Sequence, residues 1–235
     1  MLKNILITGM PGSGKSTVLE KVITKYPKKV GFITREIRKG KDREGFEIAT
    51  HTGEKALLAH ISFTTSQKVS KYFVSIPHLE SLLPKVSNFQ PDDLLYLDEI
   101  GQMQLFSDAF KALVLTYLDS DNIVLCTISK IYADAFTTSL KKRDDVLLIE
   151  ITEENRASQL EFISQLITKI LKARNYILEK ERFTIKGNTA KMRSTHALRN
   201  LSRIHNRWTC DCDFFKKHFI CSHALALTEL TSKQP

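Results

Sequence analysis

Gly9-Met10-Pro11-Gly12-Ser13-Gly14-Lys15-Ser16-Thr17 fits the pattern G-x-x-x-x-G-K-[ST], and it determines the fold that we expect for this 235-residue chain. The apolar residues directly before it predict a buried strand, and apolar residues recur at helical spacing after it. A strand, a glycine-rich turn and a helix in this order predict a P-loop, whose backbone N–H groups surround phosphate oxygens. The sequence therefore predicts an α/β domain with a mainly parallel central sheet flanked by helices.

Two side chains of the loop have distinct predicted roles. Lys15 would reach the outer phosphates and act in catalysis, and Ser16 would ligate magnesium. The whole run is expected to contact the nucleotide: Gly9, Met10, Pro11, Gly12, Ser13, Gly14, Lys15, Ser16 and Thr17.

A second acidic segment follows the apolar residues 94–97 (LLYL), which predict a central strand. Ligands of open α/β sheets bind beyond the carboxyl ends of the strands. Asp98 would therefore hold magnesium through water, and Glu99 would polarise an attacking water molecule. We expect Ile100 and Gly101 to complete this part of the nucleotide site.

These elements, with others in the same order and spacing, resemble the thermophilic-type nucleoside-triphosphatases, a family that includes the cancer-related nucleoside triphosphatases. The resemblance covers roughly the first 175 residues. The matching segments are the P-loop and residues 31–38 (GFITREIR), 43–46 (REGF), 98–105 (DEIGQMQL) and 152–156 (TEENR). It implies hydrolysis of nucleoside 5'-triphosphates, ATP and GTP among them, to diphosphate and phosphate, with magnesium and loose base preference.

The chain departs from this family in one place. Members usually carry a lysine and a glutamate after the DEIG element, where this chain has Gln102 and Gln104. A neutral amide does not replace an ammonium beside phosphate charge. We expect this departure to affect the turnover rate more than the binding of nucleotide.

The resemblance also suggests three arginines as catalytic residues. Arg35 and Arg38 belong to a predicted hairpin with a highly charged turn, and Arg156 is expected where a helix begins after the strand 146–151. An arginine near the phosphates stabilises the charge of the transition state. The sequence does not rank the three.

Composition indicates a soluble, cytoplasmic protein. Hydrophobic residues make up 42% of the chain, which is enough to fill a core, and no apolar run approaches the roughly 18 to 20 residues of a membrane span. We expect neither a secretion signal nor a membrane anchor.

Charge divides the chain into two predicted domains. Residues 172–235 hold 13 Lys and Arg against 5 Asp and Glu, a net charge of +8, whereas residues 1–171 hold 22 against 21. An apolar stripe predicts a long helix up to about residue 176, and a short strand and a Gly-Asn turn follow. We therefore predict a nucleoside-triphosphatase domain at 1–178 and a small basic domain at 179–235.

The second domain carries the pattern C-x-C-x8-C-x-H. Cys210, Cys212, Cys221 and His223 are the four ligands that close a tetrahedral zinc site, which favours a structural over a catalytic zinc. Alternate residues of a strand share a face, so we expect the first two cysteines on one strand and the second pair at the start of a helix. The pattern, with the preceding Trp208, resembles the SWIM-type zinc finger, whose members bind nucleic acid or protein.

Three functions remain open at this stage. One is a magnesium-dependent triphosphatase whose zinc finger binds DNA or RNA through Arg193, Arg199, Arg203, Arg207, Lys216 and Lys217. Another is a nucleoside or nucleotide kinase, which shares the P-loop but needs an acceptor site. The third is a nucleotide-gated adaptor whose zinc module holds a protein partner. Base preference and oligomeric state are not accessible from the sequence.

Overall fold

The computed structural model describes residues 1–232, and the chain in it forms two compact units. Lys3–Leu160 forms the nucleotide-site unit, and Met1–Leu2 with the chain from Glu161 onward forms the zinc unit. Helix α5 (Arg156–Leu178) begins in the first unit and continues in the second. The predicted domain limits lie instead at the end of this helix, and residues 233–235 of the predicted second domain lie outside the described part.

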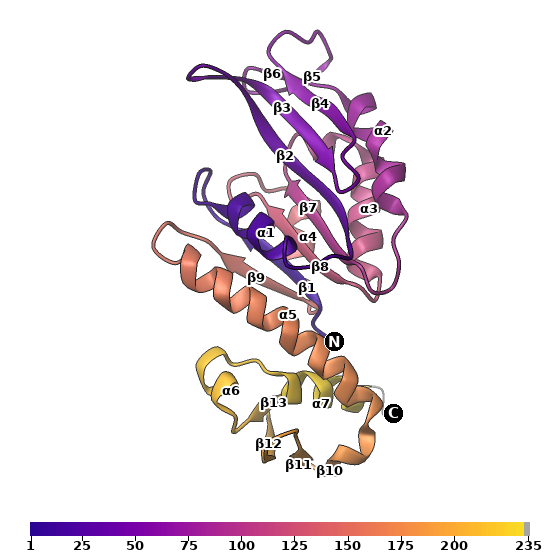
Figure 1. Cartoon of the computed structure of the whole chain (residues 1–235), viewed down its shortest axis with the longest axis vertical. Helices are drawn as coiled ribbons and strands as arrows, with labels where there is room; N and C mark the ends of the chain where they lie inside the picture. Colours follow the sequence, from indigo (N-terminus) through magenta and orange to yellow (C-terminus); the bar gives the residue numbers. More distant parts are fainter. Residues whose placement is uncertain (233–235) are drawn as a thin grey trace. The chain divides into compact units, whose positions relative to one another are not determined.

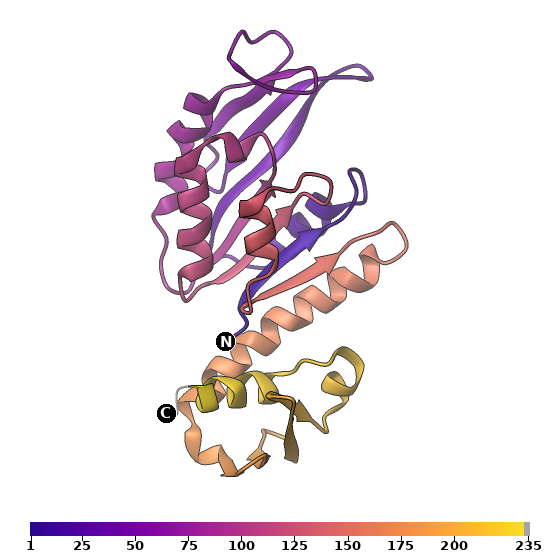
Figure 2. The same ribbon diagram turned by 180° about the vertical axis from the view of Figure 1, so that it is seen from behind.

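The nucleotide-site unit is built on a nine-stranded sheet with helices on both faces, as Figures 1 and 2 show. Its strand order is β5-β6-β4-β3-β2-β7-β8-β1-β9. The strands are β1 (Asn4–Thr8), β2 (Lys29–Lys39), β3 (Asp42–Thr50), β4 (Lys55–His60), β5 (Gln67–Val69), β6 (Tyr72–Val74), β7 (Leu94–Ile100), β8 (Ile123–Ile128) and β9 (Val146–Glu150).

The central part of this sheet is parallel, as predicted. Strands β2, β7, β8, β1 and β9 pair in parallel, and β3, β4, β6 and β5 extend the sheet in antiparallel pairs. All residues of β1 and β8 are buried, which is typical of strands covered on both faces. Because β1 and β7 run in the same direction, their carboxyl ends lie at the same edge of the sheet. Ligand sites of this fold class lie at that edge.

Helices cover the two faces of the sheet unequally. Figures 1 and 2 show α1 (Lys15–Ile23) on one face and α2 (Ile76–Ser87), α3 (Asp108–Asp119) and α4 (Ala135–Lys141) on the other. Helix α3 begins after Ser107, whose Oγ accepts a hydrogen bond of 3.0 Å from the backbone N–H of Phe110. Serine is among the residues that are most favoured at this position. The 3-10 helix η1 (Gln104–Phe106) connects β7 to α3.

The zinc unit holds a four-stranded antiparallel sheet and two short helices beside the continuing α5. Its strands are β10 (Phe183–Lys186), β11 (Thr189–Arg193), β12 (Leu198–Ile204) and β13 (Arg207–Cys210), in sequence order. The 3-10 helix η2 (Lys180–Arg182) precedes them, and α6 (Asp213–His218) and α7 (Ser222–Ser232) follow. Phe162 of α5 stacks on Phe214 and His218, which explains why most of this helix groups with the zinc unit.

Within residues 1–232, no helix combines the length and the apolar character needed to cross a bilayer.

Candidate functional site

The P-loop connects the buried strand β1 to helix α1 through backbone conformations that require glycine. Gly9 has φ 153°, and a Cβ at this position would lie 2.4 Å from the carbonyl oxygen of Ile151. Gly14 caps α1 with φ 96°, in the left-handed region that other residues rarely adopt. A larger residue at either position would displace the loop from the N-terminus of the helix, where phosphate binds.

The side chains of the loop face the carboxyl end of β7. The Nζ atom of Lys15 donates to the carbonyl oxygens of Gly9 and Met10 at 3.2 Å each, which holds it across the loop. The Oγ atom of Ser16 donates to Oδ1 of Asp98 at 3.0 Å. This pairing of a loop hydroxyl with a strand-end carboxylate is the ligand arrangement that magnesium takes beside nucleotide phosphates.

Asp98 and Glu99 are carboxyl groups withdrawn from water. Burial raises the pKa of Asp98 to about 6, although hydrogen bonds from Thr127, at 2.5 Å, and from Ser16 oppose the shift. Burial also raises the pKa of Glu99, and the nearby charge of Lys15 opposes it. A cation or a water molecule that reaches these oxygens would therefore replace lost solvation.

A cavity of about 550 Å³ lies over this edge of the sheet. It brings together the predicted residues Gly9, Pro11, Gly12, Lys15, Ser16, Asp98, Glu99 and Gly101. Of the remaining predicted residues, Met10 and Ser13 line a separate cavity of about 190 Å³. Ile100 belongs to the apolar core, and Thr17 is exposed on α1. The side chain of Ile100 is thus directed away from the cavity that its neighbours line.

The cavity also has residues that sequence reasoning missed. Lys130 lines it just beyond the end of β8 and forms an ion pair with Glu150. Glu36 and Arg43 line it from the β2–β3 hairpin, and Arg43 donates to Tyr72 Oη at 2.9 Å. The rule that placed Asp98 at a strand end applies equally to Lys130, so its position after the strand 123–128 was an available signal.

The two glutamines that depart from the family pattern lie in different environments. Gln104 is buried, and its Nε2 donates to Oγ1 of Thr34 at 3.2 Å. Thr34 in turn donates to the backbone carbonyl oxygen of Asp98, so Gln104 supports the strand end through Thr34, and both residues line the cavity. Gln102 is exposed and lines the cavity.

The three candidate arginines differ in their position relative to the P-loop and the cavity. A Cβ added to Gly14 would lie 3.5 Å from Cδ and 3.8 Å from Nη1 of Arg156, so this guanidinium lies against the P-loop. Arg35 is exposed and pairs with Glu20 at 3.7 Å. Arg38 pairs with Glu36 at the exposed surface of the hairpin, and neither Arg35 nor Arg38 lines the cavity.

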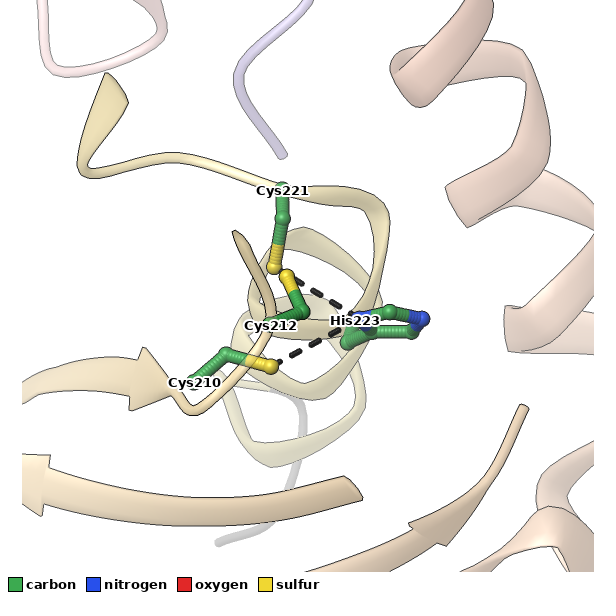
Figure 3. A group of neighbouring side chains, drawn as sticks. All are labelled: Cys210, Cys212, Cys221 and His223. Carbon is green, nitrogen blue, oxygen red and sulfur yellow. Dashed lines mark hydrogen bonds between the residues drawn. The ribbon is translucent and has the colours of Figure 1, made fainter. Parts of the chain in front are cut away.

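Four potential zinc ligands converge in the zinc unit, as Figure 3 shows. The ligand atoms of Cys210, Cys212, Cys221 and His223 all lie within 4.8 Å of one another. Nδ1 of His223 lies 3.5 Å from Sγ of Cys210 and 3.8 Å from Sγ of Cys221. A tetrahedral site with metal–sulfur bonds of about 2.3 Å has ligands about 3.8 Å apart, so this group fits zinc.

Without a metal, the surroundings favour the thiolate at Cys210 only, because hydrogen bonding to Cys210 and burial raise the pKa of Cys221, and burial raises the pKa of Cys212. Hydrogen bonds from Cys221 and His223 outweigh burial and lower the pKa of Cys210 to about 4, which favours a thiolate. The backbone N–H of Ala224 donates to Sγ of Cys221 at 3.4 Å, and the ring of Tyr176 stacks on His223 at 5.7 Å. Both contacts help to orient the ligand side chains.

The local structure differs from the sequence prediction at one ligand. Strand β13 ends at Cys210, and Cys212 is the residue that precedes helix α6. The two cysteines therefore meet through a turn and not along one strand. His223 lies in the first turn of α7, as expected.

Comparison with known proteins agrees with this geometry. The family model described as NTPase matches residues 4–187, which is most of the chain. The chain belongs to this NTPase family. A second model, the SWIM zinc finger, matches residues 204–230 and includes all four ligands of the cluster.

The match to relatives in the NTPase family spans most of the length of each relative. The chain is 40% identical to the nucleoside-triphosphatase THEP1 of Thermotoga maritima over 158 residues, which are 66% of this chain and 90% of the relative. It is 34% identical to THEP1 of Aquifex aeolicus over 176 residues, 70% of this chain and 99% of the relative. This similarity makes the chain a nucleoside-triphosphatase.

Solved structures of the family share the fold. The crystal structure of THEP1 from Aquifex aeolicus superposes with a TM-score of 0.63 at 32% identity, over 70% of this chain and 98% of that one. The solution structure of a human cancer-related nucleoside triphosphatase gives 0.60 at 29% identity, over 70% and 97%. Both cover nearly the whole of the relative, so the zinc finger is an addition to a complete NTPase fold.

Proposed function

We propose that the chain hydrolyses nucleoside 5'-triphosphates to diphosphate and phosphate with magnesium, and that its zinc unit binds nucleic acid. The observation that carries the first part is the 3.0 Å contact between Ser16 Oγ and Asp98 Oδ1, beside the carboxylate of Glu99 in one cavity. Hydrolysis needs a phosphate cradle, a cation site and a general base, and the P-loop, the Ser16–Asp98 pair and Glu99 would supply them in that order.

The proposed reaction uses each of these groups in turn. The P-loop holds the phosphates, and Lys15 exchanges its carbonyl contacts for the outer phosphate oxygens. Magnesium, held by Ser16 and through water by Asp98, would neutralise phosphate charge when bound.

Glu99 would then accept a proton from the attacking water. The water oxygen forms a bond to the γ-phosphorus as the bond from that phosphorus to the diphosphate oxygen breaks. Burial raises the pKa of Glu99, which makes the carboxylate a stronger base than one in water. Arg156, which lies against the loop at Gly14, is the arginine best situated to offset the charge that develops.

The second part of the proposal depends on charge. The chain from residue 172 onward holds 13 Lys and Arg against 5 Asp and Glu, and nucleic acids are the polyanions that such an excess attracts most strongly. The zinc cluster would fix the fold of the unit that presents these charges.

Release of phosphate from ATP and GTP, with magnesium and with excess chelator, tests the reaction. We expect release that chelation abolishes. The same assay with added nucleosides separates hydrolysis from a kinase, because a kinase would transfer the phosphate to the nucleoside instead of releasing it. Salt-dependent binding of the zinc-loaded chain to DNA and RNA tests the second part, and an absence of binding would favour a protein-binding adaptor.

A further inference from the structure

The sheet of the zinc unit has one buried and one exposed face. Cross-strand pairs place Met192 beside Arg199, and Leu201 beside Cys210. With Ala190 and Trp208, most of these side chains are buried, so they define an inner face directed at the core of the unit. Residues at the alternating positions must point to the opposite side.

We call this opposite side the outer sheet face. Its members alternate with the inner residues along all four strands: Thr184, Lys186, Thr189, Lys191, Arg193, Leu198, Asn200, Ser202, Ile204, Arg207 and Thr209. All are exposed except Thr209, which is partly buried. Four are basic and none is acidic.

The four basic residues of this face have no ion-pair partner in the described part of the chain. Within residues 1–232, Lys186, Lys191, Arg193 and Arg207 form no ion pair, whereas Lys216 on α6 pairs with Asp213 at 3.7 Å. The carboxylate of Asp211 accepts hydrogen bonds from the backbone and side chain of Asn200 at 3.0 Å. Asp211 is thus hydrogen-bonded to a neutral residue of the outer sheet face and not to one of its four cations. Unpaired cations spread over a regular surface are available to an external anion.

This arrangement separates the basic residues that the sequence grouped together. Arg193 and Arg207 belong to the outer sheet face, but Arg199 and Arg203 lie at inner-face positions, paired across the strands with Met192 and Trp208. Lys216 and Lys217 lie on α6. The six predicted residues therefore do not form one surface, and Lys186 and Lys191 extend the face that the sequence identified only in part.

We propose that the outer sheet face binds the sugar-phosphate backbone of duplex nucleic acid. The inference rests on the proposed nucleic-acid binding of the zinc unit and assigns it a surface. Neighbouring strands lie about 4.8 Å apart and alternate residues of a strand about 7 Å apart, so the cations form a spaced set suited to successive phosphates. The face has no aromatic side chain, so it offers no platform for stacking unpaired bases. Recognition is therefore electrostatic and independent of base sequence.

A salt titration of the zinc-loaded full chain tests this surface. The probes are a mixed-sequence DNA duplex, the matching RNA duplex and a single strand, each with a fluorescent label. Binding that uses phosphate contacts loses affinity with rising salt, with a slope of about −0.9 in log K against log salt for each contact on duplex DNA. For the double variant K191A/R193A we expect that slope to become shallower by about 1.8, and affinity at 0.1 M salt to fall roughly tenfold or more.

The matched control is K216A/K217A, which removes the same charge from helix α6 of the same unit and leaves all four strands unchanged. We expect its slope to stay close to that of the wild type. R207A tests a third cation of the outer sheet face, and we expect its slope to be shallower than that of the wild type by about 0.9. All these side chains are exposed, and zinc content with far-ultraviolet circular dichroism verifies that each variant is folded.

The possible failures are distinguishable. If the wild type shows no salt-sensitive binding, the proposed nucleic-acid function itself fails. If the wild type binds but K191A/R193A and its control lose equal affinity, only net charge matters and the outer sheet face is not the site. Tighter binding to the single strand than to either duplex also overturns the inference, because that preference requires contacts to bases. Different affinities for the DNA and RNA duplexes identify the natural class.

Discussion

The two ligand sites of this chain are built in opposite ways. The nucleotide site combines residues from distant parts of the sequence: Ser16, Asp98 and Thr127. A sheet whose central strands are buried on both faces brings them together. The zinc ligands lie within 14 positions of one another, from Cys210 to His223, in a unit with a much smaller buried core. The first site is held by the fold, whereas the second site holds the fold around it.

Loss of the metal is the strongest test of the claim that the zinc site, unlike the nucleotide site, stabilises the fold around it. Zinc supplies on the order of 10 kcal/mol to modules of this size, so Cys212→Ser or His223→Ala should abolish zinc binding and unfold the chain beyond about residue 180. The nucleotide-site unit should stay folded. Metal analysis with hydrogen exchange measures both effects.

Cys126 provides the matched control, since it is a buried cysteine of strand β8 and far from the cluster in sequence. Cys126→Ala should keep one zinc per chain. A Cys212→Ser protein that retained full zinc and a protected β13 would show that this unit folds without its metal site.

Substitutions at the nucleotide site should leave the fold intact and act on chemistry alone. Lys15→Ala removes the cation that contacts the outer phosphates and should abolish tight nucleotide binding. Glu99→Gln should retain binding but reduce kcat by about 10²- to 10⁴-fold, since general-base catalysis contributes that much. Nucleotide titration and phosphate release separate the two defects.

Lys21→Ala, on the exposed face of the same helix as Lys15, is the control and should bind nucleotide normally. Wild-type phosphate release by Glu99→Gln at saturating nucleotide would remove Glu99 from the mechanism.

The arginines allow a finer comparison within one site. Arg156→Ala should lower kcat roughly 10- to 100-fold, because a hydrogen bond to a charged group contributes about 1.5–3 kcal/mol. Arg35→Ala removes only an exposed pair with Glu20, so its rate should remain within about threefold of the wild type. Equal losses in the two variants would mean that the hairpin moves onto the phosphates during the reaction.

The smallest expected effect concerns the exposed glutamine at the cavity. Gln102→Lys places an ammonium where the family usually has one, and it should tighten nucleotide binding or raise turnover by about two- to fivefold, as expected for a solvent-exposed charge. Titration with nucleotide at low and high salt measures it. If neither quantity changes, position 102 is remote from the bound phosphates.

Local motifs made much of this structure predictable. The P-loop and the strand before Asp98 each encode their geometry within a few residues, and the parallel sheet follows from how such motifs are connected. The N-cap at Ser107 is equally local. For these elements the chemistry and the conformation depend on the same short stretch. The cysteine spacing identified the ligand group but not the turn that separates Cys210 from Cys212.

Other features were not accessible because they depend on pairing across the sheet. The strands β5 and β6 are three residues each and carry little periodic signal. The approach of Arg156 to Gly14 joins residues 142 positions apart, and the separation of Arg199 from Arg193 requires the register of β11 and β12. A charge count records how many basic residues there are but not which face they occupy.

Trp208 gives the zinc unit a built-in optical label. It is the single tryptophan of the chain, is buried on the inner face two residues before Cys210, and its Nε1 donates to Thr231 of α7 at 3.0 Å. Indole emission shifts to longer wavelength when the ring becomes hydrated, so selective excitation of tryptophan reports on this unit alone, while the nucleotide-site unit contributes only tyrosine. Titration with a chelator in a fluorimeter can therefore follow the loss of metal and of structure in the intact chain without any attached dye.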